Sequence, residues 1–233
     1  MDDAAEAVTE RPAEAICPRC LKPMSLSVCD SITPVANHVS VLILQHPQEQ
    51  DKILGTARLT AVSLTDATFR VGLSWPSLAK ALGRPADAKR WAVLYLGAAR
   101  PGDFPKDRDV LVLDKTGAPV ADQDAALGHI EGIVVFDGTW SQAKTLWWRN
   151  AWVLKGKRVA LNPKRPSLYG KLRREPRPEG LATIEAVGLL LARIEGRPEI
   201  ETALRDNFRK MLERVAASGV ATAPARRSRG RRR

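Results

Sequence analysis

The stretch GIVVFDGTWSQAKTLWWRN, at residues 132–150, places one carboxylate at the end of an apolar run and aromatic residues directly behind it. The carboxylate, Asp137, has three interpretations: a general base, an acceptor for a substrate N–H or O–H, or the cap of a following helix. The indole of Trp140 is a flat surface for an adenine ring or a nucleobase, and such stacking contributes roughly 1–3 kcal/mol per base. The pattern predicts a site at Asp137 with Trp140 as its wall.

Two further segments are rich in groups that bind substrates. His46, Lys52 and Arg58 follow the apolar run 38–47, and a loop after a buried strand often carries function, although a loop satisfied by its own contacts is the alternative. In LRREPRPEGLATIEA, at 172–186, an arginine run suits phosphates or a ligand carboxylate, with a solvated charged run as the alternative. Thr183 opens the next helix, either as its cap or beside a bound carboxylate.

Three cysteines have the spacing of a metal site. Cys17-x-x-Cys20 is followed by Cys29, and thiolates at this spacing suit tetrahedral zinc, which takes four ligands. The chain has no fourth cysteine, and His38 is the nearest candidate for the fourth ligand. Free thiols in a turn are the alternative.

The elements that must position these groups alternate between strands and helices. Strands are expected at 38–47, 67–73, 90–97, 109–114, 132–137 and 157–163, and helices at 56–64, 77–83, 181–196, 199–218 and directly after residue 137, where Thr139 or Ser141 is the cap. Continuous apolar strands alternating with helices favour an α/β fold, with a mainly parallel sheet covered on both faces. Ligands bind such sheets at the carboxyl ends of the strands, where Asp137 lies.

The composition points to an anionic partner. The 233 residues carry a net charge of +11, and six of the last eight residues are arginine. Without these six arginines the chain still carries a charge of +5, which favours nucleic acid as a binding partner. The alternative is a soluble protein with a cationic tail. No apolar run is long enough to span a bilayer and the first residues lack a signal-peptide pattern, so we expect a cytoplasmic protein with no membrane partner.

Four regions are expected along the chain. Residues 1–15 and the Arg-rich tail 219–233 are expected to be disordered, residues 16–37 form a small Cys-rich element, and residues 38–218 form the catalytic domain.

Taken together, the segments resemble the DTW-domain family of tRNA-uridine aminocarboxypropyltransferases. The Asp-x-Thr-Trp signature that names the family is present as DGTW at 137–140, followed by SQAK. The resemblance extends to CPRC at 17–20, VLILQHPQE at 41–49, TARL at 56–59, LRREP at 172–176 and LATIEA at 181–186. These motifs occur in the family's order and cover nearly the whole chain. Ser27 stands where the family often has a fourth cysteine, and Leu96 and Gly55 also depart from its pattern.

The resemblance implies a SPOUT-like enzyme with a C-terminal trefoil knot that holds S-adenosylmethionine. The 3-amino-3-carboxypropyl group of that cofactor would move to N3 of a tRNA uridine, giving acp3U and methylthioadenosine, and any zinc would be structural. A SPOUT-type RNA methyltransferase and a non-catalytic RNA-binding protein are the alternatives. The resemblance implies no obligate protein partner.

The resemblance also implies roles for particular residues. Asp137 would be the catalytic base or would orient the uridine. The cofactor-binding residues would be Leu94, Tyr95, Gly97, Thr139, Trp140, Arg173, Glu175, Thr183 and Glu185, with Arg173 and Thr183 on the moving carboxylate and Glu185 or Glu175 on its ammonium. The RNA-binding residues would be His46, Lys52, Arg58, Lys144 and Arg174.

Overall fold

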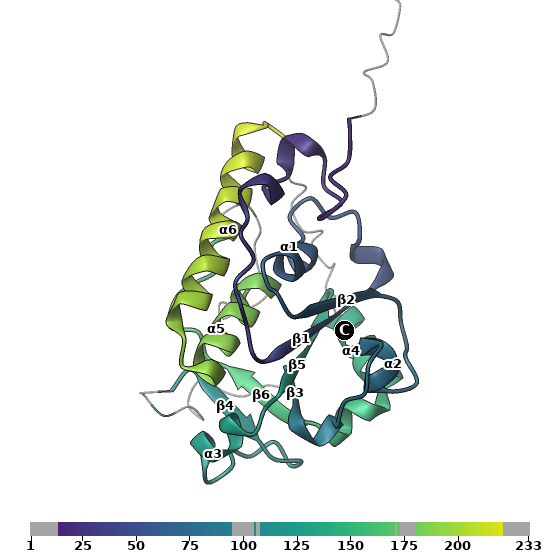
Figure 1. Ribbon diagram of the computed structural model, residues 1–233, viewed down its shortest axis with the longest axis vertical. Helices are drawn as coiled ribbons and strands as arrows, with labels where there is room; N and C mark the ends of the chain where they lie inside the picture. Colours follow the sequence, from purple (N-terminus) through teal and green to yellow (C-terminus); the bar gives the residue numbers. More distant parts are fainter. Residues whose placement is uncertain (1–13, 95–104, 106–107, 171, 173–179, 221–233) are drawn as a thin grey trace, which may run out of the picture.

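The computed structural model describes residues 14–94, 105, 108–170, 172 and 180–220 (Figure 1). Its centre is a six-stranded sheet in the order β2-β1-β5-β3-β6-β4. The strands are β1 (Ser40–Gln45), β2 (Ala67–Val71), β3 (Trp91–Leu94), β4 (Val110–Leu113), β5 (Gly132–Asp137) and β6 (Lys157–Leu161). Every neighbouring pair is parallel except β4 with β6, so the expected α/β fold with a mainly parallel sheet is confirmed.

Helices cover both faces of the sheet, as expected. They are α1 (Ala57–Val62), α2 (Leu78–Leu82), α3 (Gln123–Gly128), α4 (Trp140–Arg149), α5 (Thr183–Glu195) and α6 (Pro198–Ala217). In β1, Val41 and Ile43 pack in the core beneath α1, α5 and α6, while Leu42 and Leu44 pack with α2 and α4 on the other face. All four side chains are fully buried, which explains why this strand is continuously apolar rather than alternating.

The sequence pattern did not predict α3 or the antiparallel direction of β4. Helix α3 was not predicted because the side chain of a buried glutamine, Gln123, holds this helix on the sheet. Gln123 is buried, its Oε1 accepts from the Val112 N–H at 2.8 Å, and its Nε2 donates to the carbonyls of Val112 and Val120 at 3.0 and 2.8 Å. Hydrogen bonds thus attach this short helix to β4. Because prediction from sequence relies on the spacing of apolar residues, a helix held in this way gives little signal.

The Cys-rich element packs directly on the α/β body. It contains two 3₁₀ turns, η1 (Met24–Leu26) and η2 (Cys29–Ser31), and lies beside the carboxyl-terminal end of α6 (Figure 1). Val28 belongs to the same buried cluster as α5 and α6, and Asp30 forms a two-point ion pair with Arg214 of α6. The element therefore shares the core of the larger unit.

Among the described helices, none combines the length and the apolar character needed to cross a bilayer.

Candidate active site

Asp137 lies at the carboxyl edge of the sheet, where three distant segments meet. β1 and β5 are in register with Gln45 opposite Asp137, and the Gln45 Nε2 donates to Asp137 Oδ2 at 2.9 Å. The Thr183 hydroxyl, at the start of α5, donates to Asp137 Oδ1 at 2.5 Å. Each carboxylate oxygen therefore accepts one hydrogen bond. An ionised carboxylate offers roughly four acceptor positions, so Asp137 retains capacity for a substrate proton.

The helix-cap interpretation of Asp137 is wrong, because Thr139 caps α4. The Thr139 hydroxyl accepts from the Gln142 N–H at 3.4 Å, and Gln142 Oε1 accepts from the Thr139 N–H at 2.6 Å, a reciprocal capping box. Thr183 is not a cap either, because the N-cap of α5 is Ala182. The side chains of Asp137 and Thr183 therefore form a hydrogen bond with each other, and neither of them caps a helix.

Glu185 has a structural role, which corrects its expected role as an anchor for a ligand ammonium. Its side chain is 1% exposed. Oε1 accepts from the Leu168 N–H at 3.0 Å and from the Arg205 guanidinium at 2.8 Å, and Oε2 accepts from the Ser167 hydroxyl at 2.5 Å and from the Ala182 N–H at 3.1 Å. Its roughly four acceptor positions are filled, so no position remains for a ligand.

The aromatic residues behind Asp137 divide into three environments. Trp140 is the first residue of α4 and is half-buried, with the Lys144 ammonium 6.0 Å from its ring centroid. Trp147 packs edge-on against Phe136, with 6.1 Å between ring centroids. Trp148, by contrast, is 77% exposed.

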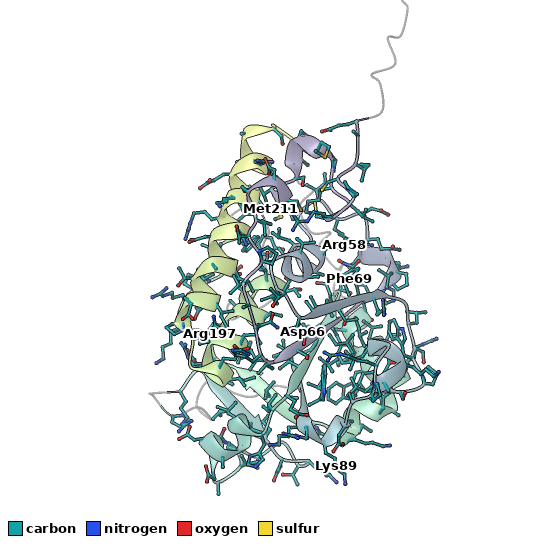
Figure 2. All side chains as sticks on the ribbon, viewed as in Figure 1. Arg58, Asp66, Phe69, Lys89, Arg197 and Met211 are labelled. Carbon is teal, nitrogen blue, oxygen red and sulfur yellow. The ribbon has the colours of Figure 1, made fainter. Side chains whose placement is uncertain are left out.

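The polar loop after β1 does not present all its residues to solvent. His46 is the N-cap of η3 (Pro47–Glu49), and its Nδ1 accepts from the Gln48 N–H at 3.3 Å. Lys52 is half-exposed and pairs with Glu49 at 3.2 Å. Arg58 lies over the ring of Phe69, with its guanidinium carbon 4.5 Å from the ring centroid (Figure 2). Arg58 is half-buried, so part of its side chain is held against Phe69 rather than available for the RNA contact that sequence analysis expected.

A small pocket adjoins Gln45, the hydrogen-bond partner of Asp137, and lies between this loop and the Cys-rich element. Its volume is about 50 Å³. It is lined by Cys20, Leu21, Lys22, Pro23, Gln45, Glu49, Gln50, Asp51, Lys52, Ile53, Gly55, Ala57 and Arg58. The family motif at 41–49 contains Gln45 and Glu49, but sequence analysis gave neither of them a particular role, and it gave none to Lys22. For Lys22 no sequence signal existed, because a lysine in a turn is normally solvated.

Lys22 is almost fully buried in the wall of this pocket. Its ammonium donates to the carbonyl of Ile53 and approaches the carbonyl of Lys52 at 3.5 Å. Burial lowers the pKa of Lys22 to about 8, while the nearby Asp137 carboxylate opposes that shift. Lys22 thus places a buried ammonium between the Cys-rich element and the loop after β1.

The three cysteines form one buried cluster. The Sγ atoms of Cys17, Cys20 and Cys29 all lie within 4.8 Å of one another, so these residues could hold a metal ion. Ser27 lies beside them, with its hydroxyl 3.3 Å from the Cys20 sulfur and from the Cys29 N–H. His38, the expected fourth ligand, is exposed and is not part of the cluster that the described residues form.

The cluster stabilises charge on one sulfur. Burial acts to raise the pKa of Cys17, but hydrogen bonds from the Ser27 hydroxyl and from backbone N–H groups outweigh it and lower that pKa to about 6. Burial instead raises the pKa of Cys29 to about 12. Cys17 therefore takes the thiolate form, which is the form that binds metals, more readily than Cys29 does.

The remaining predicted site residues are placed as follows. Leu94 is the half-buried last residue of β3. Tyr95, Gly97, Arg173, Arg174 and Glu175 lie outside the described residues.

Comparison with known proteins agrees with the motifs at this site. The DTW-domain family model matches residues 14–216. The tRNA-uridine aminocarboxypropyltransferase 2 of Macaca fascicularis is 28% identical over 219 residues, covering 88% of this chain and 66% of that protein. The proteins of the same name from Mus musculus and Drosophila melanogaster are 27% identical over 81% of this chain, and over 60% and 70% of their own lengths.

The chain thus spans about two thirds of the length of these curated relatives. No solved structure is significantly similar to it. The family model covers most of the chain, including the cysteine cluster, the pocket and the segment from Asp137 to Trp140, and the chain therefore belongs to the DTW-domain family.

Proposed function

We propose that the protein transfers the 3-amino-3-carboxypropyl group of S-adenosylmethionine to N3 of a tRNA uridine, giving acp3U and methylthioadenosine. The observation that carries the proposal is Asp137, a carboxylate held by Gln45 and Thr183 at the ligand-binding edge of a parallel sheet. The names of the relatives and the net charge of +11 support a tRNA substrate. The proposal includes the SPOUT-like knot, whose expected loops lie partly outside the described residues.

Asp137 acts on the uridine. N3 of uracil carries a proton at neutral pH, so a base must accept it while the N3 electron pair forms the new bond to carbon. One Asp137 oxygen accepts that proton, and the hydrogen bonds from Gln45 and Thr183 keep the carboxylate oriented. S-adenosylmethionine supplies a sulfonium whose sulfur takes the electrons of the broken carbon–sulfur bond and departs as neutral methylthioadenosine. Trp140 stacks on the adenine and holds the donor in line.

The direct test uses purified protein, unmodified tRNA and S-adenosylmethionine. Mass spectrometry of the digested nucleosides separates the three outcomes by mass: aminocarboxypropyl transfer, methyl transfer or no transfer. Aminocarboxypropyl-uridine supports the proposal. Methyl-uridine, or unchanged nucleosides from a protein that binds the tRNA, contradicts it.

Trp140→Ala should weaken the binding of S-adenosylmethionine by about tenfold, because removing an aromatic ring on which a base stacks costs roughly 1–3 kcal/mol. Calorimetry without RNA measures this. Trp148→Ala is the matched control, since that indole is 77% exposed and should leave the affinity unchanged. Equal affinities for wild type and Trp140→Ala would mean that this indole does not wall the cofactor site.

The cysteine cluster is proposed to hold one structural zinc ion per chain. Elemental analysis of the native protein should find about one zinc, and Cys20→Ser should remove it and lower the melting temperature by about 5 °C or more. Ser27→Cys supplies a fourth thiolate beside the other three and should make the zinc harder to remove with a chelator. A native protein that contains no metal would contradict the assignment.

A further inference from the structure

The pocket that adjoins Gln45 contains buried polar atoms that lack hydrogen-bond partners. Among the described residues these are Gln45 Oε1, Glu49 Oε1 and Arg58 Nε. Gln45 and Glu49 are 3% and 5% exposed, so water outside the protein does not satisfy them. Glu49 Oε1 lies 3.2 Å from the half-exposed Lys52 ammonium but accepts no hydrogen bond within the described part of the chain. Such atoms are costly to bury, and three lining one pocket indicate a bound group.

The donors and acceptors of the pocket match a zwitterion. Two oxygens, Gln45 Oε1 and the charged Glu49 Oε1, suit an ammonium group. The Arg58 guanidinium, which also lines the pocket and has its Nε without a partner, suits a carboxylate. The pocket's 50 Å³ accommodates a few groups of the size of a water molecule, each of which needs roughly 10–15 Å³.

Gln45 joins this pocket to the reacting groups. Its Nε2 donates to Asp137 at 2.9 Å, while its Oε1 lies unpartnered at the pocket. A molecule whose reacting carbon lies beside Asp137 would thus have its adjoining polar end within reach of Gln45. The aminocarboxypropyl group has this arrangement, because a short carbon chain joins its reacting carbon to the carbon that carries the ammonium and the carboxylate.

We propose that the Gln45–Glu49–Arg58 pocket binds the amino-acid end of S-adenosylmethionine, with the ammonium on Gln45 and Glu49 and the carboxylate on Arg58. This inference rests on the proposed function and identifies the anchors of the group that moves. Uracil fits less well, because it is neutral and offers no carboxylate to the Arg58 guanidinium. The anchors also explain which carbon reacts, because fixing the amino-acid end directs the chain carbon rather than the methyl group toward the uridine.

Calorimetry with the full chain tests the assignment through two ligands. S-adenosylmethionine carries the amino-acid end, and methylthioadenosine lacks it. Arg58→Met and Glu49→Gln should each weaken S-adenosylmethionine binding by about tenfold or more, because each variant removes a charge-assisted hydrogen bond to the ligand. Binding of methylthioadenosine should change by less than about twofold. Arg84→Met is the matched control, because Arg84 pairs with Asp66 rather than with pocket residues and should leave both affinities unchanged.

A second measurement uses only the wild-type protein and therefore does not depend on the folding of a variant. Decarboxylated S-adenosylmethionine, which retains the ammonium, should bind about tenfold or more weakly than S-adenosylmethionine. Equal binding of these two ligands would overturn the carboxylate assignment. Folded pocket variants that weaken the binding of methylthioadenosine as much as that of S-adenosylmethionine would also overturn the assignment, because the pocket would then hold the adenosine. Variants that raise only the KM for tRNA would overturn it too, because the pocket would then hold the uridine.

The outcomes separate this inference from the proposed function. A wild-type protein that binds neither S-adenosylmethionine nor methylthioadenosine overturns both. A protein that shows the expected affinities but transfers a methyl group retains the amino-acid pocket and loses the proposed reaction.

Discussion

The Asp137→Asn variant is expected to lose aminocarboxypropyl transfer almost completely, with the turnover number falling by about 10²–10⁴-fold. Asparagine keeps the shape and one acceptor oxygen. With that oxygen toward Gln45 Nε2, the asparagine amide donates to the Thr183 hydroxyl, so Gln45 keeps its orientation. The side chain no longer accepts the uridine N3 proton, which is the step that the carboxylate performs. Single-turnover rates with saturating tRNA measure the loss, and calorimetry should show that the Kd for S-adenosylmethionine changes by less than about threefold.

The Thr183→Val variant is expected to lose less activity than Asp137→Asn. It removes the hydrogen bond to Asp137 Oδ1 and keeps the carboxylate, so a smaller loss of about tenfold is expected. Near-normal turnover in Asp137→Asn would show that Asp137 only orients the uridine, or that another group accepts the proton. Equal losses in both variants would show that carboxylate position matters more than its basicity.

Deletion of residues 226–233 is expected to produce the largest change in tRNA affinity. These residues contain six arginines and lie outside the described part of the chain. Each arginine that neutralises a phosphate releases condensed counterions, so the slope of log affinity against log salt should flatten by roughly 0.7–0.9 for each phosphate that is no longer neutralised. Filter binding across a salt series measures the slope. Turnover at saturating tRNA should stay within about twofold of wild type, because no proposed site residue lies in the tail.

A charge-preserving control separates electrostatics from specific recognition. Replacing the six arginines by lysines keeps the charge and should retain most of the salt slope, whereas replacing them by serines should reproduce the deletion. Equal slopes for full-length and truncated protein would mean that the tail does not contact RNA. The +5 body would then supply the electrostatic attraction alone.

Local patterns in the sequence determined most of the fold. Strand β5 occupies residues 132–137 as predicted, because an apolar run bounded by Gly132 and Asp137 is a strong strand signal. Gly83 ends α2 with a positive φ of 81°, and Thr139 caps α4, because both signals act within a few residues. The cysteine spacing likewise predicted a cluster that the structure contains.

Only the tertiary structure decided which groups share the site. Asp137 and Thr183 are 46 positions apart, and their hydrogen bond depends on where α5 begins relative to the edge of β5. Gln45 meets Asp137 because β1 and β5 pair in one particular register, which no periodicity within either strand specifies. The position of Arg58, over Phe69 and at the wall of the pocket, depends on the packing of α1 against β2. Sequence patterns report the conformation of neighbouring residues, whereas the site is made by residues that only the packing of helices on a sheet brings together.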